Sequence, residues 1–240
     1  MDEKQLIFDR KSHAIYSPKA KQTIQRILAR EYAPDEAETL WEQIQLQYVD
    51  FLRDEPPLGG LKLASTFYNS ILIFAWYAVV PRKPAIREVQ NDALLLFMGD
   101  FHWLGKIFNL NRRLDMRIAN AVFRYAMHMK AEEAKRFPAS FHVSEYTFDA
   151  RSNAVRYSFS QCPHAEFAKR HNMLDALPIM CNCDHLAMRQ LHAGLIREGT
   201  CATGSVCDYC IVGDQNPLFR QYELVTLPNG LMVSRAVHGK

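Results

Sequence analysis

Cysteine is absent from the first 161 residues of this 240-residue chain. All six cysteines, Cys162 and five more between Cys181 and Cys210, lie in one short window near the C-terminal end. A large net charge is absent as well. The net charge is only +3, and no run of lysine and arginine interleaved with aromatics predicts binding to nucleic acid. With 48% hydrophobic residues, the chain can bury a core without disulfides. The clustered thiols therefore call for another explanation.

A secretory signal and a membrane span are not expected either. The stretch MDEKQLIFDRKSH is charged and lacks an apolar run, so we expect a cytoplasmic protein, in which clustered cysteines are more often catalytic or metal-binding than paired. The uncharged segment LASTFYNSILIFAWYAVV (63–80) has about the minimum length of a span. Its polar residues and the lack of a second span favour a helix buried inside the protein. The same helix could serve as the interface of a homodimer.

The apolar periodicity predicts a helical region over residues 1–139, with helices that begin at Pro18 and Pro34. Residues 140–240 have an α+β pattern. Hairpins are expected over 141–162 and 219–237, helices over 163–171 and 174–192, and short strands over 199–205 and 207–213. The predicted fold class is α+β, with a helical N-terminal half packed on a C-terminal antiparallel sheet that carries two or three helices. We expect the two regions to form one integrated domain.

Two cysteines of the window lie at helix positions that suit chemistry. Cys162 precedes Pro163, which is favoured at the first position of a helix, so the thiol would sit at the N-cap. Backbone N–H groups and the helix dipole stabilise a thiolate there, although free cysteine is also often a small buried hydrophobe. Cys181, Asp184 and His185 share one face if 174–192 is a helix, and could transfer protons together. A partly buried helix with a salt-linked histidine explains the spacing equally well.

In the strand predicted over 207–213, side chains alternate between two faces. Cys207 and Tyr209 should face one side, and Asp208 and Cys210 the other. Cys207 and Cys210 have the spacing of half a zinc site. A zinc site that combines them with Cys181, Cys183 and His185 would need both segments to be loops, because Cys181 and Cys183 point apart on a helix and Cys207 and Cys210 point apart on a strand.

The segment QCPHAEFAKRHNMLDALPIMCNCDHLAMRQL, followed by GTCATGSVCDYCIV, resembles the L-2-amino-thiazoline-4-carboxylic acid hydrolase family. The resemblance covers residues 141–213 in detail. It rests on Cys162-Pro163, on Cys181 with Asp184, and on Thr200, Gly204 and Cys207-Asp208-Tyr209 in this order. Cys183, Cys201 and Cys210 lie outside the pattern, and Arg197 stands three residues before Thr200 rather than directly before it.

The resemblance implies hydrolysis of a small cyclic amidine or thiazoline at a carbon bonded to nitrogen and sulfur. Such chemistry needs a nucleophile, a proton donor for the leaving group and donors for the substrate carboxylate. The implied catalytic residues are Cys207, Cys162, Cys181, Asp184, Asp208 and His185, with Cys207 the favoured nucleophile. The implied substrate-binding residues are Thr200, Gly204, Tyr209, His164 and Arg197, and Arg189 is an alternative clamp for an acid group. No cofactor is expected.

Two other classes of function remain open at this stage. One is a small-molecule binding module without turnover, and the other is an interaction protein stabilised by zinc. The first would retain a ligand but release no product, and the second would contain about one metal ion per chain and collapse when it is chelated.

Overall fold

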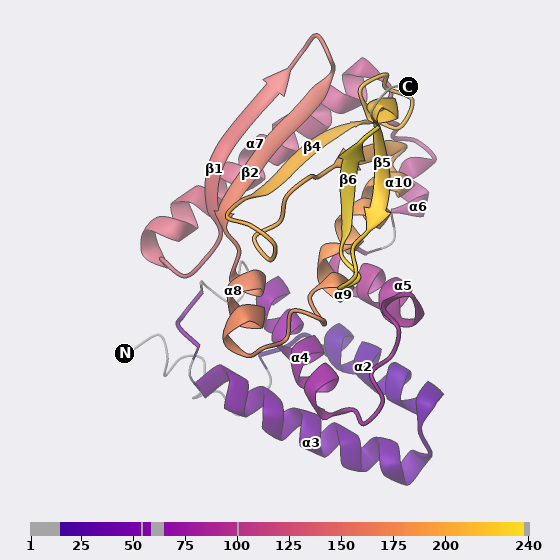
Figure 1. Cartoon of the computed structure of the whole chain (residues 1–240), viewed down its shortest axis with the longest axis vertical. Helices are drawn as coiled ribbons and strands as arrows, with labels where there is room; N and C mark the ends of the chain where they lie inside the picture. Colours follow the sequence, from indigo (N-terminus) through magenta and orange to yellow (C-terminus); the bar gives the residue numbers. More distant parts are fainter. Residues whose placement is uncertain (1–14, 54, 59–64, 100, 238–240) are drawn as a thin grey trace.

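The computed structural model describes residues 15–53, 55–58, 65–99 and 101–237 (Figure 1). Its helices are α2 (Pro18–Glu31), α3 (Pro34–Arg53), α4 (Ser65–Val79), α5 (Ile86–Phe97), α6 (His102–Gly105), α7 (Arg113–Arg136), α8 (Pro163–Arg170), α9 (Pro178–Cys181) and α10 (Cys183–Gln190). A short 3-10 helix follows at Phe219–Gln221. The helices before residue 140 and the strands after it make the chain an α+β protein, as the sequence predicts.

The strands form two antiparallel sheets. They are β1 (His142–Asp149), β2 (Ala154–Gln161), β3 (Ala193–Ile196), β4 (Cys207–Gly213), β5 (Tyr222–Thr226) and β6 (Met232–Ala236). The larger sheet has the order β1-β2-β4-β3, and β5 pairs with β6 alone. In the register of β2 with β4, Phe159 lies opposite Cys207 and Tyr157 opposite Tyr209. This register brings two aromatic side chains beside the segment that carries Cys207.

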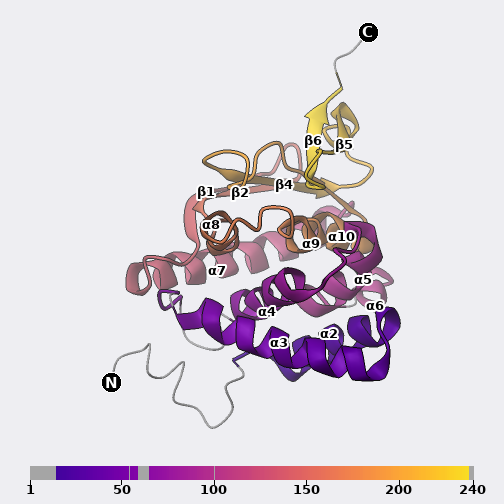
Figure 2. The same cartoon turned by 60° about the horizontal axis from the view of Figure 1, so that its bottom comes forward.

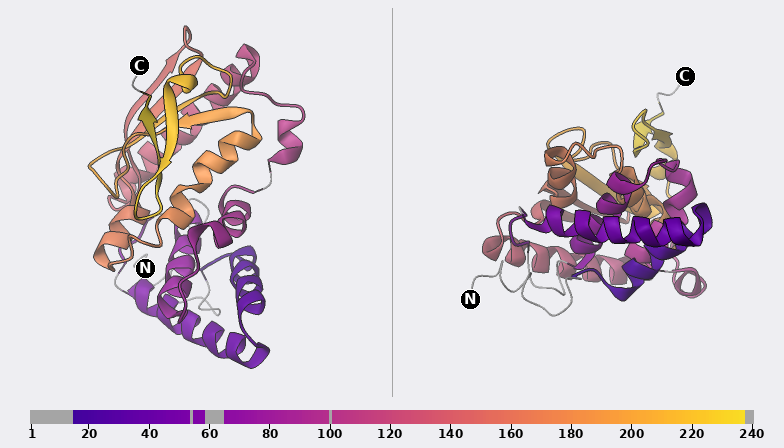
Figure 3. Two further views of the ribbon diagram at one scale, coloured as in Figure 1. Left: turned by 45° about the vertical axis from the view of Figure 1, so that its right-hand side comes forward. Right: turned by 90° about the horizontal axis from the view of Figure 1, so that it is seen from below.

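Helices cover one face of the larger sheet, and the β5–β6 hairpin stands on its other side (Figure 2). Helices α7, α8, α9 and α10 lie next to the sheet, and α2 to α5 form a further layer below them (Figures 2 and 3). One hydrophobic core runs from Ile24 and Tyr48 in the outer helices through Phe74 and Phe167 to Ile211 in the sheet. The core therefore crosses residue 140 without interruption.

Most elements lie where the sequence predicts them. Ser17 caps α2 by accepting a hydrogen bond from the Ala20 N–H, and Pro18 and Pro34 are the first residues of their helices. Gly99 lies two residues after the end of α5 and has a φ of +82°, a value that glycine adopts without strain. The hairpins β1–β2 and β5–β6 are also confirmed.

Two local predictions are wrong. Residues 199–205 form no strand; they make turns, held by hydrogen bonds from the Thr203 and Gly204 N–H groups to the Thr200 carbonyl oxygen. The second strand that pairs with β4, beside β2, is instead β3. Its four residues are apolar and buried, so the sequence shows no alternation of polar and apolar residues that would predict a strand. The helix expected over 174–192 is also interrupted, since α9 ends at Cys181 and α10 begins at Cys183.

The apolar helix α4 is buried within its own chain, between α3 and α8. From Phe67 to Trp76 every side chain is buried, and the homodimer considered from the sequence stays a prediction. None of the helices in the described part of the chain combines the length and apolar character needed to cross a membrane. Leu63 and Ala64, at the start of the apolar segment, lie outside the described residues.

Candidate functional site

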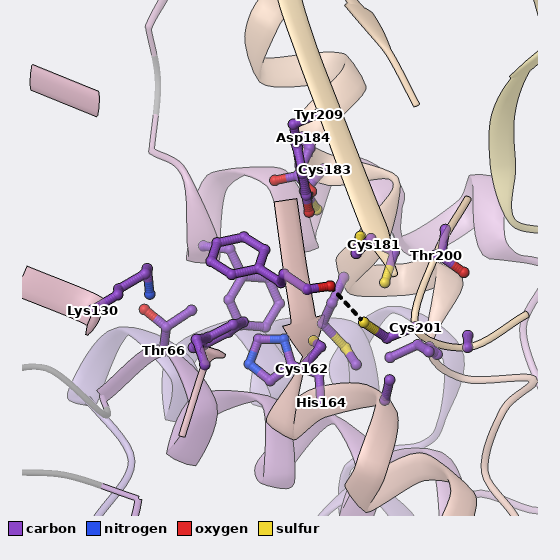
Figure 4. A pocket seen from close by; sticks show the side chains of 18 of the residues that line it. Thr66, Lys130, Cys162, His164, Cys181, Cys183, Asp184, Thr200, Cys201 and Tyr209 are labelled. Atoms are coloured by element: carbon purple, nitrogen blue, oxygen red, sulfur yellow. Dashed lines mark hydrogen bonds between the residues drawn. The ribbon is translucent and has the colours of Figure 1, made fainter. Parts of the chain in front are cut away.

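A cavity of about 250 Å³ lies between the larger sheet and the helices (Figure 4). Its wall combines α4, α5, α7, α8, α9, α10, the strands β2 and β4 and the loop after β3. Apolar side chains, such as Phe141, Phe159 and Met127, form much of the lining. The cavity is somewhat smaller than the pockets that hold drug-sized ligands, so it suits a small molecule.

Five of the six cysteines line this cavity: Cys162, Cys181, Cys183, Cys201 and Cys207. They come from the N-cap of α8, the end of α9, the start of α10, the loop after β3 and the start of β4. All six thiols are free. The clustering in the sequence therefore becomes clustering in space, and it includes Cys183 and Cys201, which lie outside the family pattern.

Strand β4 separates its side chains as the alternation predicts. Cys207 and Tyr209 face the cavity. Cys210 lies on the other side, in a small core with Ile196 and Val212. Cys207 and Cys210 therefore do not converge on one point.

Asp208, which was a candidate catalytic residue, also lies away from the cavity. Its carboxylate accepts hydrogen bonds from the backbone N–H groups of Glu198 (3.0 Å) and Gly199 (2.6 Å). These bonds hold the loop that leads from β3 to Thr200. Asp208 therefore stabilises this loop, because each of its two carboxylate oxygens accepts a hydrogen bond from a backbone N–H group.

Asp184 is the carboxylate of the cavity. Its Oδ2 accepts hydrogen bonds from Arg197 Nη1 (3.1 Å) and from the Tyr209 hydroxyl (3.0 Å). Among the described residues, none donates a hydrogen bond to Oδ1, and the side chain keeps 30% of its surface exposed although it lies deep in the protein. Burial raises the pKa of Asp184, whereas Arg197 and Tyr209 oppose this shift. One oxygen is thus anchored and the other is free for a ligand.

Arg197 was predicted to clamp the acid group of a substrate, but its side chain is completely buried and does not line the cavity. Its guanidinium also donates to the carbonyl oxygens of Cys181 (3.0 Å) and Met232 (3.1 Å). It lies 5.7 Å from the centre of the Tyr209 ring. Arg197 therefore positions Asp184 and Tyr209 from behind the cavity wall.

The thiols of the cavity are protonated at neutral pH. Burial raises the pKa of Cys207 to about 11, against the opposing effects of Arg197 and the Tyr209 hydroxyl. Burial also raises the pKa of Cys162 to about 12, although the N–H groups of Ala165 and His164 favour its thiolate. The N-cap position is thus as predicted, but desolvation outweighs the stabilisation of a thiolate there. Cys181 is shifted upward by the same cause.

The two candidate histidines lie on different sides of the wall. The ring of His164 lines the cavity, stacked on Phe67 at 5.5 Å, and burial together with Lys130 lowers its pKa to about 3. His185 is on α10 but points to the β5–β6 hairpin, where its Nε2 lies 3.1 Å from the Met232 carbonyl oxygen. The break between α9 and α10 keeps Cys181 and Asp184 at the cavity while His185 faces away.

The remaining candidates come from the loop after β3. Thr200 is buried and lines the cavity, and its hydroxyl oxygen lies 3.2 Å from that of Thr203. Gly204, which the resemblance implies as a substrate-binding residue, is exposed and lies outside the cavity lining. A methyl group added at Gly204 would make only an ordinary contact with the Thr200 carbonyl oxygen.

Sequence reasoning missed Lys130 and Thr66, which bring polar groups to the cavity from α7 and α4. Lys130 falls three residues after Met127 on the buried face of α7, and a charge on an apolar stripe was the available signal. Thr66 gave no comparable signal, because a single hydroxyl in an apolar helix is common.

The described residues contain no group of three or more histidine, cysteine, aspartate or glutamate side chains arranged to hold a metal ion. Protonated thiols, one anchored carboxylate and aromatic side chains line the cavity between the sheet and the helices. Residues 105–211 match the model of the L-2-amino-thiazoline-4-carboxylic acid hydrolase family, which confirms the resemblance. The match extends from the end of α6 into β4 and contains every predicted site residue. No curated protein and no solved structure gives a significant match.

Proposed function

We propose that the protein is a cysteine-dependent hydrolase of a small cyclic amidine of the aminothiazoline type. The observation that carries this proposal is the meeting of Cys207, Tyr209 and Asp184 at one cavity, where no described residue donates a hydrogen bond to Asp184 Oδ1. The family match supports hydrolase chemistry. The type of substrate is inferred from the family match, and the use of a thiol nucleophile from the site.

Asp184 would bind the cationic end of the substrate. An amidinium offers two parallel N–H donors, and a carboxylate is their natural partner. Its positive charge would also stabilise the ionised form of Asp184, whose pKa burial raises. The Tyr209 hydroxyl and Arg197 hold the carboxylate in one orientation, so the ring carbon is presented to the thiols in a defined pose.

Cys207 would act as the nucleophile. Its sulfur bonds to the carbon between the ring nitrogen and the ring sulfur, and its thiol proton passes to Asp184. The ring C–S bond then breaks and the ring sulfur takes this proton, which leaves an isothiourea on Cys207. Water adds to the same carbon and the bond to Cys207 breaks. Of the two protons of the water, one goes to the Cys207 sulfur and the other to a nitrogen of the carbamoyl group, whose oxygen comes from the water. The product is an N-carbamoyl derivative of cysteine.

The raised pKa of Cys207 is compatible with this sequence of steps. A thiol with a pKa of about 11 is protected from adventitious alkylation and oxidation in the free protein. It becomes nucleophilic only when a base removes its proton, and Asp184 lies on the same wall. Activation would thus depend on a bound substrate.

The test is turnover of 2-amino-thiazoline-4-carboxylic acid, followed by mass spectrometry of the product. We expect N-carbamoyl cysteine from the wild-type protein and a loss of roughly a thousandfold or more in kcat for Cys207→Ser. Cys162→Ser and Cys181→Ser, on the same cavity, serve as matched variants. Equal activity of Cys207→Ser and the wild-type protein would eliminate the proposed nucleophile.

A binding module without turnover is the second candidate, and the protonated state of the cavity thiols favours it. It predicts that the same compound is retained by the protein and recovered unchanged. An acid-quenched sample distinguishes the two candidates, because only the hydrolase carries the substrate covalently on Cys207.

A further inference from the structure

Of the side chains described around the cavity, that of Lys130 is the one that carries a positive charge. Among the described lining residues, the other basic side chain is His164, whose pKa of about 3 keeps it neutral. Lys130 reaches the cavity from α7, the long helix against β1. It is half-buried, and burial lowers the pKa of its ammonium group.

This ammonium group has no carboxylate partner in the described part of the chain. Its Nζ lies 4.0 Å from the centre of the Phe141 ring, a cation–π contact that satisfies none of its three N–H donors. Glu133 and Asp184 act on it electrostatically but form no ion pair with it. A half-buried cation without a partner is unfavourable unless a ligand supplies the missing anion.

The cavity is thus charged at two places of opposite sign. Lys130 and Asp184 come from different helices, and Figure 4 shows Lys130 beside Thr66, apart from Asp184 and Tyr209. Each charge has unused hydrogen-bonding capacity within the described part of the chain, since Asp184 Oδ1 receives no donor there and the contact of Lys130 with the Phe141 ring uses none of its N–H groups. A ligand with a carboxylate at one end and a cation at the other matches this arrangement.

Arg197 and Arg189, the arginines that were candidates for binding an acid group, do not line this cavity. Arg197 is sealed behind the wall with its guanidinium directed at Asp184, Cys181 and Met232. Arg189 is exposed and borders a different, smaller hollow near β5 and β6. Lys130 is the cation that reaches the cavity lined by the thiols.

We propose that Lys130 binds the carboxylate of the substrate and thereby selects amino-acid-like zwitterions over neutral or purely cationic amidines. This inference rests on the proposed function for the identity of the cationic end, which Asp184 would hold. Lys130 does not take part in bond making; it determines which molecules bind and in which direction they lie.

The experiment is a calorimetric titration with two probes that differ only in the acid group, 2-amino-2-thiazoline-4-carboxylic acid and 2-amino-2-thiazoline. It is done on the full chain and on Lys130→Met, Lys130→Arg and Lys135→Met. Lys135 is the matched control, because it lies on the same helix and its only described ion pair is the exposed one with Glu132. Thermal melting of each variant shows that it is folded.

We expect Lys130→Met to weaken binding of 2-amino-2-thiazoline-4-carboxylic acid at least tenfold. Binding of 2-amino-2-thiazoline, which lacks the acid group, should not change. Lys130→Arg should recover part of the affinity for the acid, and Lys135→Met should bind both probes as the wild-type protein does. Equal losses for both probes, no loss for the acid, or no binding of the acid to the wild-type protein would each overturn the role of Lys130.

These outcomes are separate from those of the proposed function, because binding does not require turnover. If Cys207→Ser abolishes product formation while Lys130→Met binds the acid normally, the hydrolase stands and the assignment of Lys130 fails. If the acid binds through Lys130 but is never converted, the assignment stands and the hydrolase fails.

Discussion

The two faces of β4 each carry a cysteine and have different surroundings. On one face, Cys207 and Tyr209 border a cavity that also contains Asp184. On the other face, Asp208 holds the backbone of the loop before Thr200, and Cys210 fills a small core. Both faces present a thiol and both have a carboxylate nearby. On the cavity face, the Cys207 thiol and the Asp184 carboxylate line the same cavity, whereas Asp208 and Cys210 line no part of it.

The comparison shows that the side of the strand on which a residue lies decides its role. A period of two separates Cys207 from Cys210 and Tyr209 from Asp208 whatever their chemistry. The thiol next to a hollow can meet a substrate, whereas the thiol packed among Ile196 and Val212 can only contribute to stability. Four experiments would break or sharpen this distinction.

The largest difference is expected between the two carboxylates. Asp184→Asn should lower kcat/KM by about a hundredfold or more, because it removes the negative charge for the amidinium and the acceptor for the thiol proton. Asp208→Asn should change kcat/KM by less than about threefold, since its carboxylate binds only backbone N–H groups. Steady-state kinetics on the two purified variants gives both values, and a larger loss from Asp208→Asn would reverse the assignment.

A smaller difference is expected in the reactivity of the cavity thiol. Burial raises the pKa of Cys207 from 9.0 to about 11, so its thiolate fraction at neutral pH is about a hundredfold below that of an ordinary thiol. Alkylation of native Cys207 by iodoacetamide should therefore be slow at pH 8 and rise about tenfold per pH unit up to about pH 11. Peptide mass spectrometry measures the rate, with the unfolded chain as the reference. Fast labelling at pH 8 would contradict a protonated thiol.

The raised pKa of Cys207 also predicts that the folded state becomes less stable at high pH. The folded-state pKa is above that of the unfolded thiol, so the protonated form is favoured by folding. This contribution is fully present below pH 9 and is lost as the pH rises from 9 toward 11. Urea titrations at pH 8 and pH 10 should show a lower free energy of unfolding at the higher pH.

The smallest effect is expected on the other face of β4. Cys210→Ala removes one buried sulfur atom from the core with Ile196 and Val212, and should lower the free energy of unfolding by about 1 kcal/mol. Turnover should not change. The midpoint of urea unfolding measures the loss, and reduced turnover in a fully folded variant would show that the two faces are coupled.

Much of the fold follows from local patterns. Prolines at positions 18 and 34 begin helices because proline suits the first helical turn, and the alternating hairpins appear where they are predicted. β3 could not be found in this way, since Ala193–Ile196 is buried on both faces and its apolar run has no period. The break at Asn182 was missed too, because the residues on either side have helical character.

The candidate site was predicted in part. The clustering of cysteines and the alternation along residues 207–210 correctly place Cys207 and Tyr209 together, since both arguments use only spacing. The roles of Arg197 and Lys130 could not be told apart in the same way. Both are basic residues near apolar ones, and only packing shows that Arg197 is sealed behind the wall while Lys130 enters the cavity.

The sequence by itself determined the α+β class, the order of most helices and hairpins, and which side chains of β4 share a face. These properties depend on local spacing and on the conformational preferences of proline and glycine. Only the tertiary structure decided which carboxylate and which cation reach the thiols. Those choices depend on the burial and direction of side chains from segments far apart in the chain, and no local pattern records either.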